Sequence, residues 1–182
     1  MLLMKLLIKF ISLFLGLIGY FISASAVYLI CFSNRKKFIL MINKVVSFYC
    51  RVGVKIFDLE VESNLKDVDW SQNYLLAGNH QSYLDIFALS SIVNTNYVTS
   101  VEVKKTSFLG PITVLAGCLF VERRSRSKLF KEIQDVTNSL LNGGNVAIFP
   151  EATSTNGEKL RSFKRSLSVS YTHLTLPTTP YV

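Results

Sequence analysis

The chain has 182 residues, enough for one ordinary domain. Apolar residues make up 49% of it and charged residues only 18%, which excludes an intrinsically disordered chain. The net charge of +8 favours anionic partners such as phospholipid headgroups, nucleic acid or phosphorylated metabolites. Three scattered cysteines predict neither a disulfide framework nor a zinc site, and we expect them to be reduced structural residues.

The N-terminal segment is strongly apolar, and residues 10–32 contain no Asp, Glu, Lys, Arg, His or Pro. As a helix this segment would be about 35 Å long, enough to cross a bilayer core of about 30 Å. The alternative is a secretory signal cleaved after the small residues 24–26. The apolar run continues past that point, which favours a membrane anchor. The basic residues 35–37 that follow favour a cytoplasmic location for the rest of the chain.

The next segment, residues 38–54, has the pattern of a basic amphipathic helix. Four cations fall on one stripe of a helical wheel: Lys37, Lys44, Arg51 and Lys55. Such a helix can lie in a membrane interface with its cations towards headgroups. It can equally pack on its own domain and leave a charged face in water, and the pattern leaves both open. We therefore predict an N-terminal unit, residues 1–54, of a membrane anchor and an interfacial helix.

From residue 55 onward, short apolar runs alternate with longer periodic ones. The predicted strands are 55–61, 74–78, 97–101, 118–121 and 145–149, and the predicted helices are 83–93 and 127–141. Strands interleaved with helices indicate an α/β fold, a sheet flanked by helices. In open α/β sheets the ligand site forms beyond the carboxyl ends of the strands. Three predicted strands end in polar residues: Asn79 and His80, Glu122 and Arg123, and Glu151.

The first of these polar groups combines a histidine with an acid five residues later. A carboxylate at Asp85 can accept one ring N–H of His80, which leaves the other ring nitrogen free to act as a general base. The structural alternative is a capping box in which Ser82 and Asp85 begin the helix predicted over 83–93. That alternative explains Ser82 and Asp85 but leaves His80 without a role.

The other two groups suit a phosphate or polyol. Arg123 follows a buried strand, and its guanidinium can hold a phosphate bidentately. A solvated basic edge is the simpler explanation of an arginine considered alone. Glu151 and Thr153 follow the last strand where it stops at a proline, although this segment considered alone is typical of a turn.

The chain lacks the sequence motifs of several other classes of enzyme and binding protein. The chain has no G-x-S-x-G elbow, no P-loop and no G-x-G-x-x-G fingerprint. Two histidines without a cysteine cluster argue against a transition-metal site. The basic segments lack the interleaved aromatic residues of single-strand nucleic-acid binders, so we expect no nucleic-acid partner.

Together the three blocks resemble the lysophosphatidic acid acyltransferase family, the 1-acylglycerol-3-phosphate O-acyltransferases, within the glycerolipid acyltransferases. The family's N-H-x-x-x-x-D block is matched by Asn79, His80 and Asp85. Its glycine–aromatic–acid–arginine block is matched by Gly117, Phe120, Glu122 and Arg123. Its F-P-E-G-T block is matched by Phe149, Pro150, Glu151 and Thr153. The resemblance covers residues 10–167.

This resemblance implies a membrane-bound enzyme that moves a fatty acyl group to the free hydroxyl of a lysophospholipid. His80, assisted by Asp85, would be the catalytic base. The implied substrate-binding residues are Asn79, Gly117, Arg123, Glu151 and Thr153. The acyl donor would be acyl-CoA or acyl carrier protein, with no cofactor or metal. A non-catalytic adaptor for anionic membrane lipid, or an acyltransferase for another lysolipid headgroup, is the alternative.

The chain departs from the family pattern in two ways. Ala152 stands where the family has a glycine, which bears on substrate preference because the extra Cβ restricts the backbone and close approach. The match ends at residue 167, where the family continues with further helices and strands. We therefore expect residues 55–167 to form an incomplete catalytic domain, the C-terminal part of the fold to be missing, and residues 168–182 to be an unstructured, non-native tail.

Overall fold

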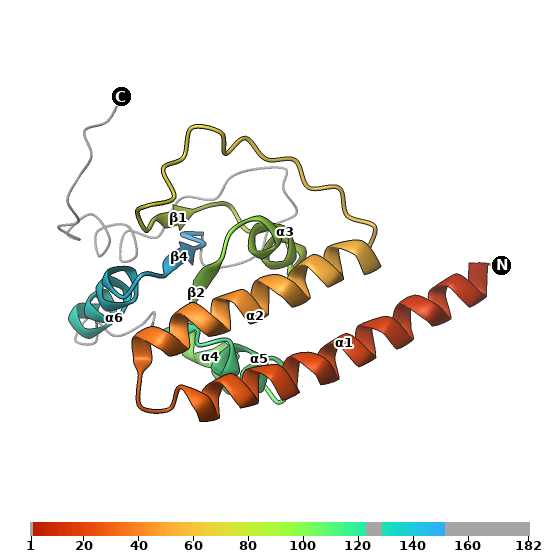
Figure 1. Cartoon of the computed structure of the whole chain (residues 1–182), viewed down its shortest axis with the longest axis horizontal. Helices are drawn as coiled ribbons and strands as arrows, with labels where there is room; N and C mark the ends of the chain where they lie inside the picture. Colours follow the sequence, from red (N-terminus) through yellow and green to blue (C-terminus); the bar gives the residue numbers. More distant parts are fainter. Residues whose placement is uncertain (1, 123–128, 152–182) are drawn as a thin grey trace.

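The computed structural model describes residues 2–122 and 129–151 of the chain (Figure 1). Two long helices come first, and an α/β unit follows. The helices are α1 (Leu2–Ile30), α2 (Arg35–Ile56), α3 (Leu84–Ile92), α4 (Val101–Lys104), α5 (Leu109–Leu115) and α6 (Leu129–Leu141). The strands are β1 (Leu75–Ala77), β2 (Thr95–Ser100), β3 (Leu119–Val121) and β4 (Asn145–Ile148).

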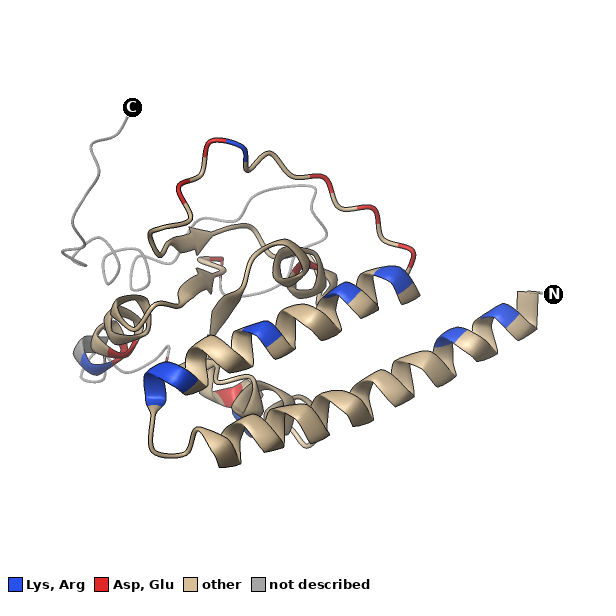
Figure 2. Cartoon of the chain, in the orientation of Figure 1, with Lys and Arg blue, Asp and Glu red and all other residues tan. Residues whose placement is uncertain are grey.

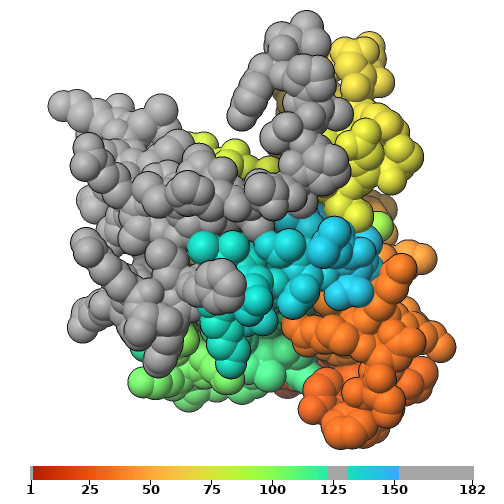
Figure 3. All heavy atoms as spheres, turned by 90° about the vertical axis from the view of Figure 1, so that its left-hand side faces the viewer, coloured from red at the N-terminus to blue at the C-terminus, as the bar shows by residue number. Residues whose placement is uncertain are grey.

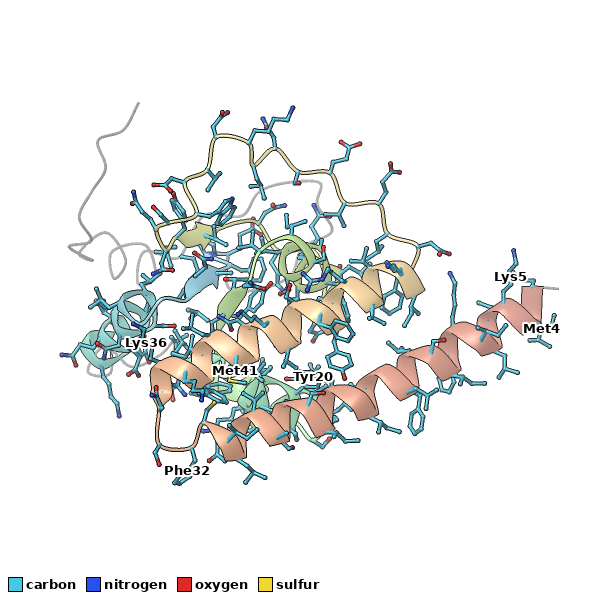
Figure 4. The ribbon with its side chains drawn as sticks, viewed as in Figure 1. Met4, Lys5, Tyr20, Phe32, Lys36 and Met41 are labelled. Carbon is cyan, nitrogen blue, oxygen red and sulfur yellow. The ribbon has the colours of Figure 1, made fainter. Side chains whose placement is uncertain are left out.

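Helices α1 and α2 form an antiparallel hairpin that turns at residues 31–34 (Figure 1). The side chain of Asn34 accepts a hydrogen bond of 2.9 Å from the backbone N–H of Lys37, which caps the start of α2. Tyr20 of α1 points towards α2 (Figure 4) and is buried in one apolar cluster with Ala24 and Ile42. Burial of this shared apolar stripe holds the hairpin together.

The outer face of α1 remains apolar and exposed. Leu3, Phe10 and Ile22 have between 66% and 80% of their surface accessible, and the rest of that face is similar. Within the part of the chain that the structure describes, α1 is the one helix long and apolar enough to cross a membrane. An exposed apolar face of this size is typical of a surface that contacts lipid or another apolar partner. The predicted anchor segment is therefore helical, and the helix begins earlier than expected, at Leu2.

Helix α2 packs on α1, α3 and β2, so its apolar face is covered by its own chain. The four predicted cations all lie exposed on α2, and Figure 2 shows basic residues along this helix. The packing agrees with the second interpretation of this segment, a helix on its own domain with a charged face outside.

The strand predicted over 55–61 is wrong. Helix α2 continues to Ile56, Phe57 caps it, and Asp58 has a left-handed φ of 53° before the chain becomes irregular. The reason is tertiary packing. The ring of Phe57 meets that of Phe87 in α3 edge-on at 5.5 Å between centroids, and Asp58 forms an ion pair with Lys9 of α1. Ile56 therefore lies in α2, and the chain after Phe57 is irregular rather than part of the sheet.

The four strands form one parallel sheet in the order β1-β4-β2-β3. Residues on one face, including Val98 and Val146, pack with Val136 and Leu140 of α6. Alternate residues point to the other face, where Tyr97 of β2 contacts α3 through its hydroxyl group. The sheet thus lies between α6 on one side and α3 with α2 on the other, which confirms the predicted α/β class.

Four of the five predicted strands and both predicted helices of this unit are present, with ends shifted by a few residues. Helices α4 and α5 were not predicted. α5 carries Gly110 and Pro111 in its first turn, a pair typical of a loop in sequence, although proline is tolerated at the start of a helix.

Candidate active site

The parallel sheet brings the carboxyl ends of its strands to one edge, and two of the predicted site residues lie there on neighbouring strands. His80 follows β1, and Glu151 follows β4. Pairing of these strands continues past the end of β1, because the backbone N–H of Gly78 donates to the carbonyl of Ile148 at 3.2 Å. The edge predicted to hold the ligand site therefore does gather His80 and Glu151.

His80 and Asp85 are in direct contact. The His80 Nδ1 atom lies 2.8 Å from Asp85 Oδ2, with the histidine side chain 18% exposed and the aspartate side chain 30% exposed. A carboxylate only accepts, so Nδ1 carries the proton and Nε2 presents a lone pair. Within residues 2–122 and 129–151, Nε2 makes no hydrogen bond. Such a tautomer is suited to take a proton from a substrate.

The same oxygen of Asp85 also organises the start of α3. Asp85 Oδ2 accepts the backbone N–H groups of Gln81 at 2.7 Å and Ser82 at 3.0 Å. Ser82 Oγ in turn accepts the N–H of Leu84 at 3.1 Å. The predicted capping box is present in modified form, because the backbone N–H of Asp85 bonds the Ser82 carbonyl and not its hydroxyl. Asp85 thus serves the helix start and the histidine with one oxygen atom.

The flat face of His80 is covered by an aromatic side chain. The rings of His80 and Phe149 stack with centroids 4.3 Å apart and planes 18° apart. Phe149 is the residue directly after β4, so the contact again joins the ends of β1 and β4. The sequence pattern marked Phe149 only as part of a block and assigned no contact to it. A sequence signal for this contact is that one predicted strand ends in an aromatic residue, Phe149, and another ends near a histidine, His80.

Glu151 is the most buried acid of the site. Its side chain is 2% exposed, and neither carboxylate oxygen has a hydrogen-bond partner among the residues that the structure describes. A buried carboxylate without partners is costly unless a donor reaches it. Asn79, by contrast, is exposed and lies beside His80 in the chain.

Gly117 lies elsewhere. It precedes β3, at the amino-terminal edge of the sheet, away from the edge that carries His80. Its φ is +72°, and a Cβ there would come within 2.9 Å of the buried Phe38 ring. Its carbonyl accepts a hydrogen bond of 2.8 Å from buried Asn96. A turn and a close packing contact account for the glycine, and its expected substrate-binding role stays a prediction.

The remaining predicted residues, Arg123 and Thr153, lie outside the described residues, as does Ala152. Glu122 is the last described residue at the end of β3, and its backbone N–H donates to Glu132 Oε1 at 2.6 Å. This bond fastens the carboxyl end of β3 to α6. The carboxyl end of β3 thus lies at the same sheet edge as the ends of β1 and β4.

A cavity of about 470 Å³ opens between α2, α6 and the start of β3. Figure 3 shows the face of the molecule on which α6 and the start of α2 lie. Its lining includes Arg35, Phe120 and Ser139, and it contains none of the site residues at the carboxyl ends of the strands. Two thiols of the chain have raised pKa values. Burial raises the pKa of Cys50 to about 11 and that of Cys118 to about 12. Both thiols are therefore protonated near neutral pH and are poor nucleophiles.

Comparison with known proteins agrees with this arrangement. Residues 58–182 match the acyltransferase family, a range that includes all three motif blocks. A 1-acyl-sn-glycerol-3-phosphate acyltransferase of Neisseria gonorrhoeae is 31% identical over 125 residues, 69% of this chain and 49% of the relative. A lyso-ornithine lipid O-acyltransferase of Rhizobium meliloti is 33% identical over 117 residues, 64% of this chain and 40% of the relative.

The fold has a solved counterpart. The crystal structure of the 1-acyl-sn-glycerophosphate acyltransferase of Thermotoga maritima superposes with a TM-score of 0.67 at 20% identity. The superposition covers 93% of this chain and 70% of the Thermotoga chain. The chain spans about half the length or less of the curated relatives above. Because residues 58–182, more than half of the chain, match one family model, the chain belongs to the acyltransferase family.

Proposed function

We propose that the chain transfers a fatty acyl group from a thioester donor to the free hydroxyl of a lysolipid, with 1-acylglycerol-3-phosphate as the acceptor. The observation that carries the proposal is the contact of 2.8 Å between His80 Nδ1 and Asp85 Oδ2 at the carboxyl edge of the sheet. Relatives that act on 1-acylglycerol-3-phosphate and on lyso-ornithine lipid support a lysolipid acceptor.

The chemistry follows from the tautomer of His80. With Nδ1–H bonded to Asp85, the Nε2 lone pair accepts the proton of the acceptor hydroxyl as its oxygen attacks the thioester carbonyl. A C–O ester bond forms, the C–S bond breaks, and the imidazolium returns its proton to the departing sulfur. Asp85 stabilises the transient imidazolium. The two substrates react directly, and the protonated thiols of Cys50 and Cys118 take no part.

Binding of the substrates falls to the other block residues. Arg123 holds the acceptor phosphate, and Glu151 and Thr153 position its glycerol part, with Asn79 beside the base. The donor is acyl-CoA or acyl carrier protein, both anionic, which suits the net charge of +8. An acceptor with one long chain resides in the bilayer. The exposed apolar face of α1 accordingly seats the protein in the membrane, with the site on the cytoplasmic side.

The test is acyl transfer from radiolabelled acyl-CoA, with purified protein and two acceptors, lysophosphatidate and lyso-ornithine lipid. We expect faster transfer to lysophosphatidate. His80→Ala should lower kcat by about 10²–10⁴-fold, the range of a general base. The matched control is His173→Ala, which removes the other histidine of the chain. Equal turnover by His80→Ala and wild-type protein would exclude His80 as the base. Faster transfer to lyso-ornithine lipid would refute 1-acylglycerol-3-phosphate as the preferred acceptor.

The exposed cations of α2 favour a second candidate, a non-catalytic adaptor that binds anionic membranes. This function predicts salt-sensitive binding to anionic vesicles, because exposed charges are screened at high ionic strength. Replacement of Lys44, Arg51 and Lys55 by glutamine would then weaken vesicle binding. Replacement of His80 or Asp85 would leave binding unchanged under both functions, so only the acyl-transfer assay separates an adaptor from an enzyme.

A further inference from the structure

We propose that Phe149 is a positioning residue for His80: its ring fixes the plane of the imidazole and so aims Nε2 at the acceptor hydroxyl. This inference rests on the proposed role of His80 as the base. It concerns a contact between the first and third sequence blocks that the chain's own geometry displays.

A hydrogen bond to one ring atom does not orient an imidazole completely. The bond from His80 Nδ1 to Asp85 Oδ2 fixes one point of the ring, and the ring can still tilt about that point. The Phe149 ring lies nearly parallel to it, 18° from its plane and 4.3 Å between centroids. A flat contact at this distance opposes tilting, because tilting drives an edge of one ring into the other. The hydrogen bond and the stack together define the direction of Nε2.

Phe149 is itself held by the rigid part of the fold. The ring of Tyr97, in the neighbouring strand β2, lies 19° from the plane of Phe149 at 6.2 Å between centroids. Tyr97 is 7% exposed, and its hydroxyl bonds Ser90 Oγ at 2.7 Å and the Ile86 carbonyl at 3.3 Å. Both partners belong to α3, the helix whose first turn contains Asp85. The two constraints on His80 therefore come from one connected unit.

The expected effect is on the chemical step. A misplacement of about 1 Å in a reacting group can cost about 100-fold in rate. Loss of the stack leaves the base, its tautomer and its Asp85 partner in place. We therefore expect Phe149→Leu to lower kcat by about 10–100-fold, less than His80→Ala does, with the KM for the acceptor unchanged. Phe149→Tyr, which keeps the ring, should restore kcat.

A spectroscopic measurement reports the stack without activity. Protons of an imidazole stacked on a phenyl ring resonate upfield because of the ring current. With His173 replaced by glutamine, His80 is the one histidine of the chain and its signals in detergent micelles are unambiguous. We expect these signals to move downfield in Phe149→Leu and to stay in Phe149→Tyr. Phe149→Met, a flexible apolar replacement, serves as a second ring-free variant if the leucine variant does not fold.

The outcomes are distinguishable. Downfield signals together with an unchanged kcat would overturn the positioning role, and signals that do not move in either ring-free variant would overturn the stack. In Phe149→Leu, a rise in the KM for the acceptor without a fall in kcat would also overturn the positioning role, since that result indicates a role in substrate binding. If His80→Ala retains full activity, the proposed function fails instead. A loss of activity in His80→Ala but not in Phe149→Leu refutes the positioning role alone.

Discussion

Replacement of Asp85 separates the catalytic explanation of this residue from the capping explanation. One oxygen, Oδ2, accepts three N–H groups: that of His80 and the backbone groups of Gln81 and Ser82. In Asp85→Asn the amide oxygen can keep all three bonds, because a rotation that turns the NH₂ group inward would lose all of them. This variant therefore removes the charge and keeps the geometry. Asp85→Ala removes both.

The magnitudes differ for activity and stability. Hydrogen bonds to a charged group contribute about 1.5–3 kcal/mol, and those between neutral groups about 0.5–1.5 kcal/mol. The negative charge of Asp85 thus stabilises the imidazolium of His80 by about 1–2 kcal/mol. We therefore expect kcat/KM of Asp85→Asn to fall by about 5–30-fold. Stability should fall by about 0.3–1 kcal/mol, the interaction of the lost charge with the N-terminus of α3. Asp85→Ala should lose about 1–2 kcal/mol, because two backbone N–H groups lose their acceptor.

The assay measures kcat/KM for acyl transfer to lysophosphatidate and the urea midpoint of unfolding on the same preparations. Ser82→Ala is the matched control. It removes the bond of 3.1 Å to the N–H of Leu84 at the helix start and leaves Asp85 and His80 in contact. We expect it to lower stability by about 1 kcal/mol and to leave kcat/KM unchanged. Full activity in Asp85→Asn, with a stability loss confined to Asp85→Ala, would refute the catalytic reasoning and leave the cap as the role of Asp85.

Three further predictions concern other residues. Gly117→Ala should destabilise the protein by about 1–3 kcal/mol in urea unfolding, because the φ of +72° disfavours a residue with a Cβ and that Cβ would lie 2.9 Å from an atom of Phe38. The control is Gly16→Ala, which has open space around it and should not destabilise the protein. Burial raises the pKa of Cys50 to about 11 from 9.0, so the unfolded chain releases the thiol proton first as pH rises. Stability should therefore fall by about 1.4 kcal/mol between pH 8 and pH 10 in thermal or urea unfolding, and this part of the fall should be absent in Cys50→Ala. Glu151→Gln should raise the acceptor KM without lowering stability, because its carboxylate has no hydrogen bond to lose among the described residues; a lower urea midpoint would contradict this.

The local patterns of the chain predicted much of the fold. Alternating and helical periodicities identified β1, β4, α3 and α6, because their apolar faces are the ones that the sheet and its helices bury. The same reasoning failed at 55–61, where apolar residues pack on α3 and extend α2, and at α5, whose Gly110 and Pro111 resemble a turn. A pattern shows that a residue is buried. It does not show which neighbour buries it.

The candidate site divides in the same way. The spacing of His80 and Asp85 was sufficient to predict their contact, since a strand end followed by a helix start brings residues five apart together. The glycine of the second block carried no such local information, and its place at the far edge of the sheet follows from the direction of β3.

The amino-acid sequence alone determined the chemistry available to this protein: an apolar N-terminal segment, a histidine with its acid, and acidic and basic groups after successive strands. Only the tertiary structure decided that β1 and β4 are neighbours, so that Phe149 covers the face of His80 and Glu151 is buried at the same edge. The physical reason is strand order. Side chains close in sequence meet through local geometry, whereas residues some seventy positions apart, such as His80 and Phe149, meet only when the whole sheet forms.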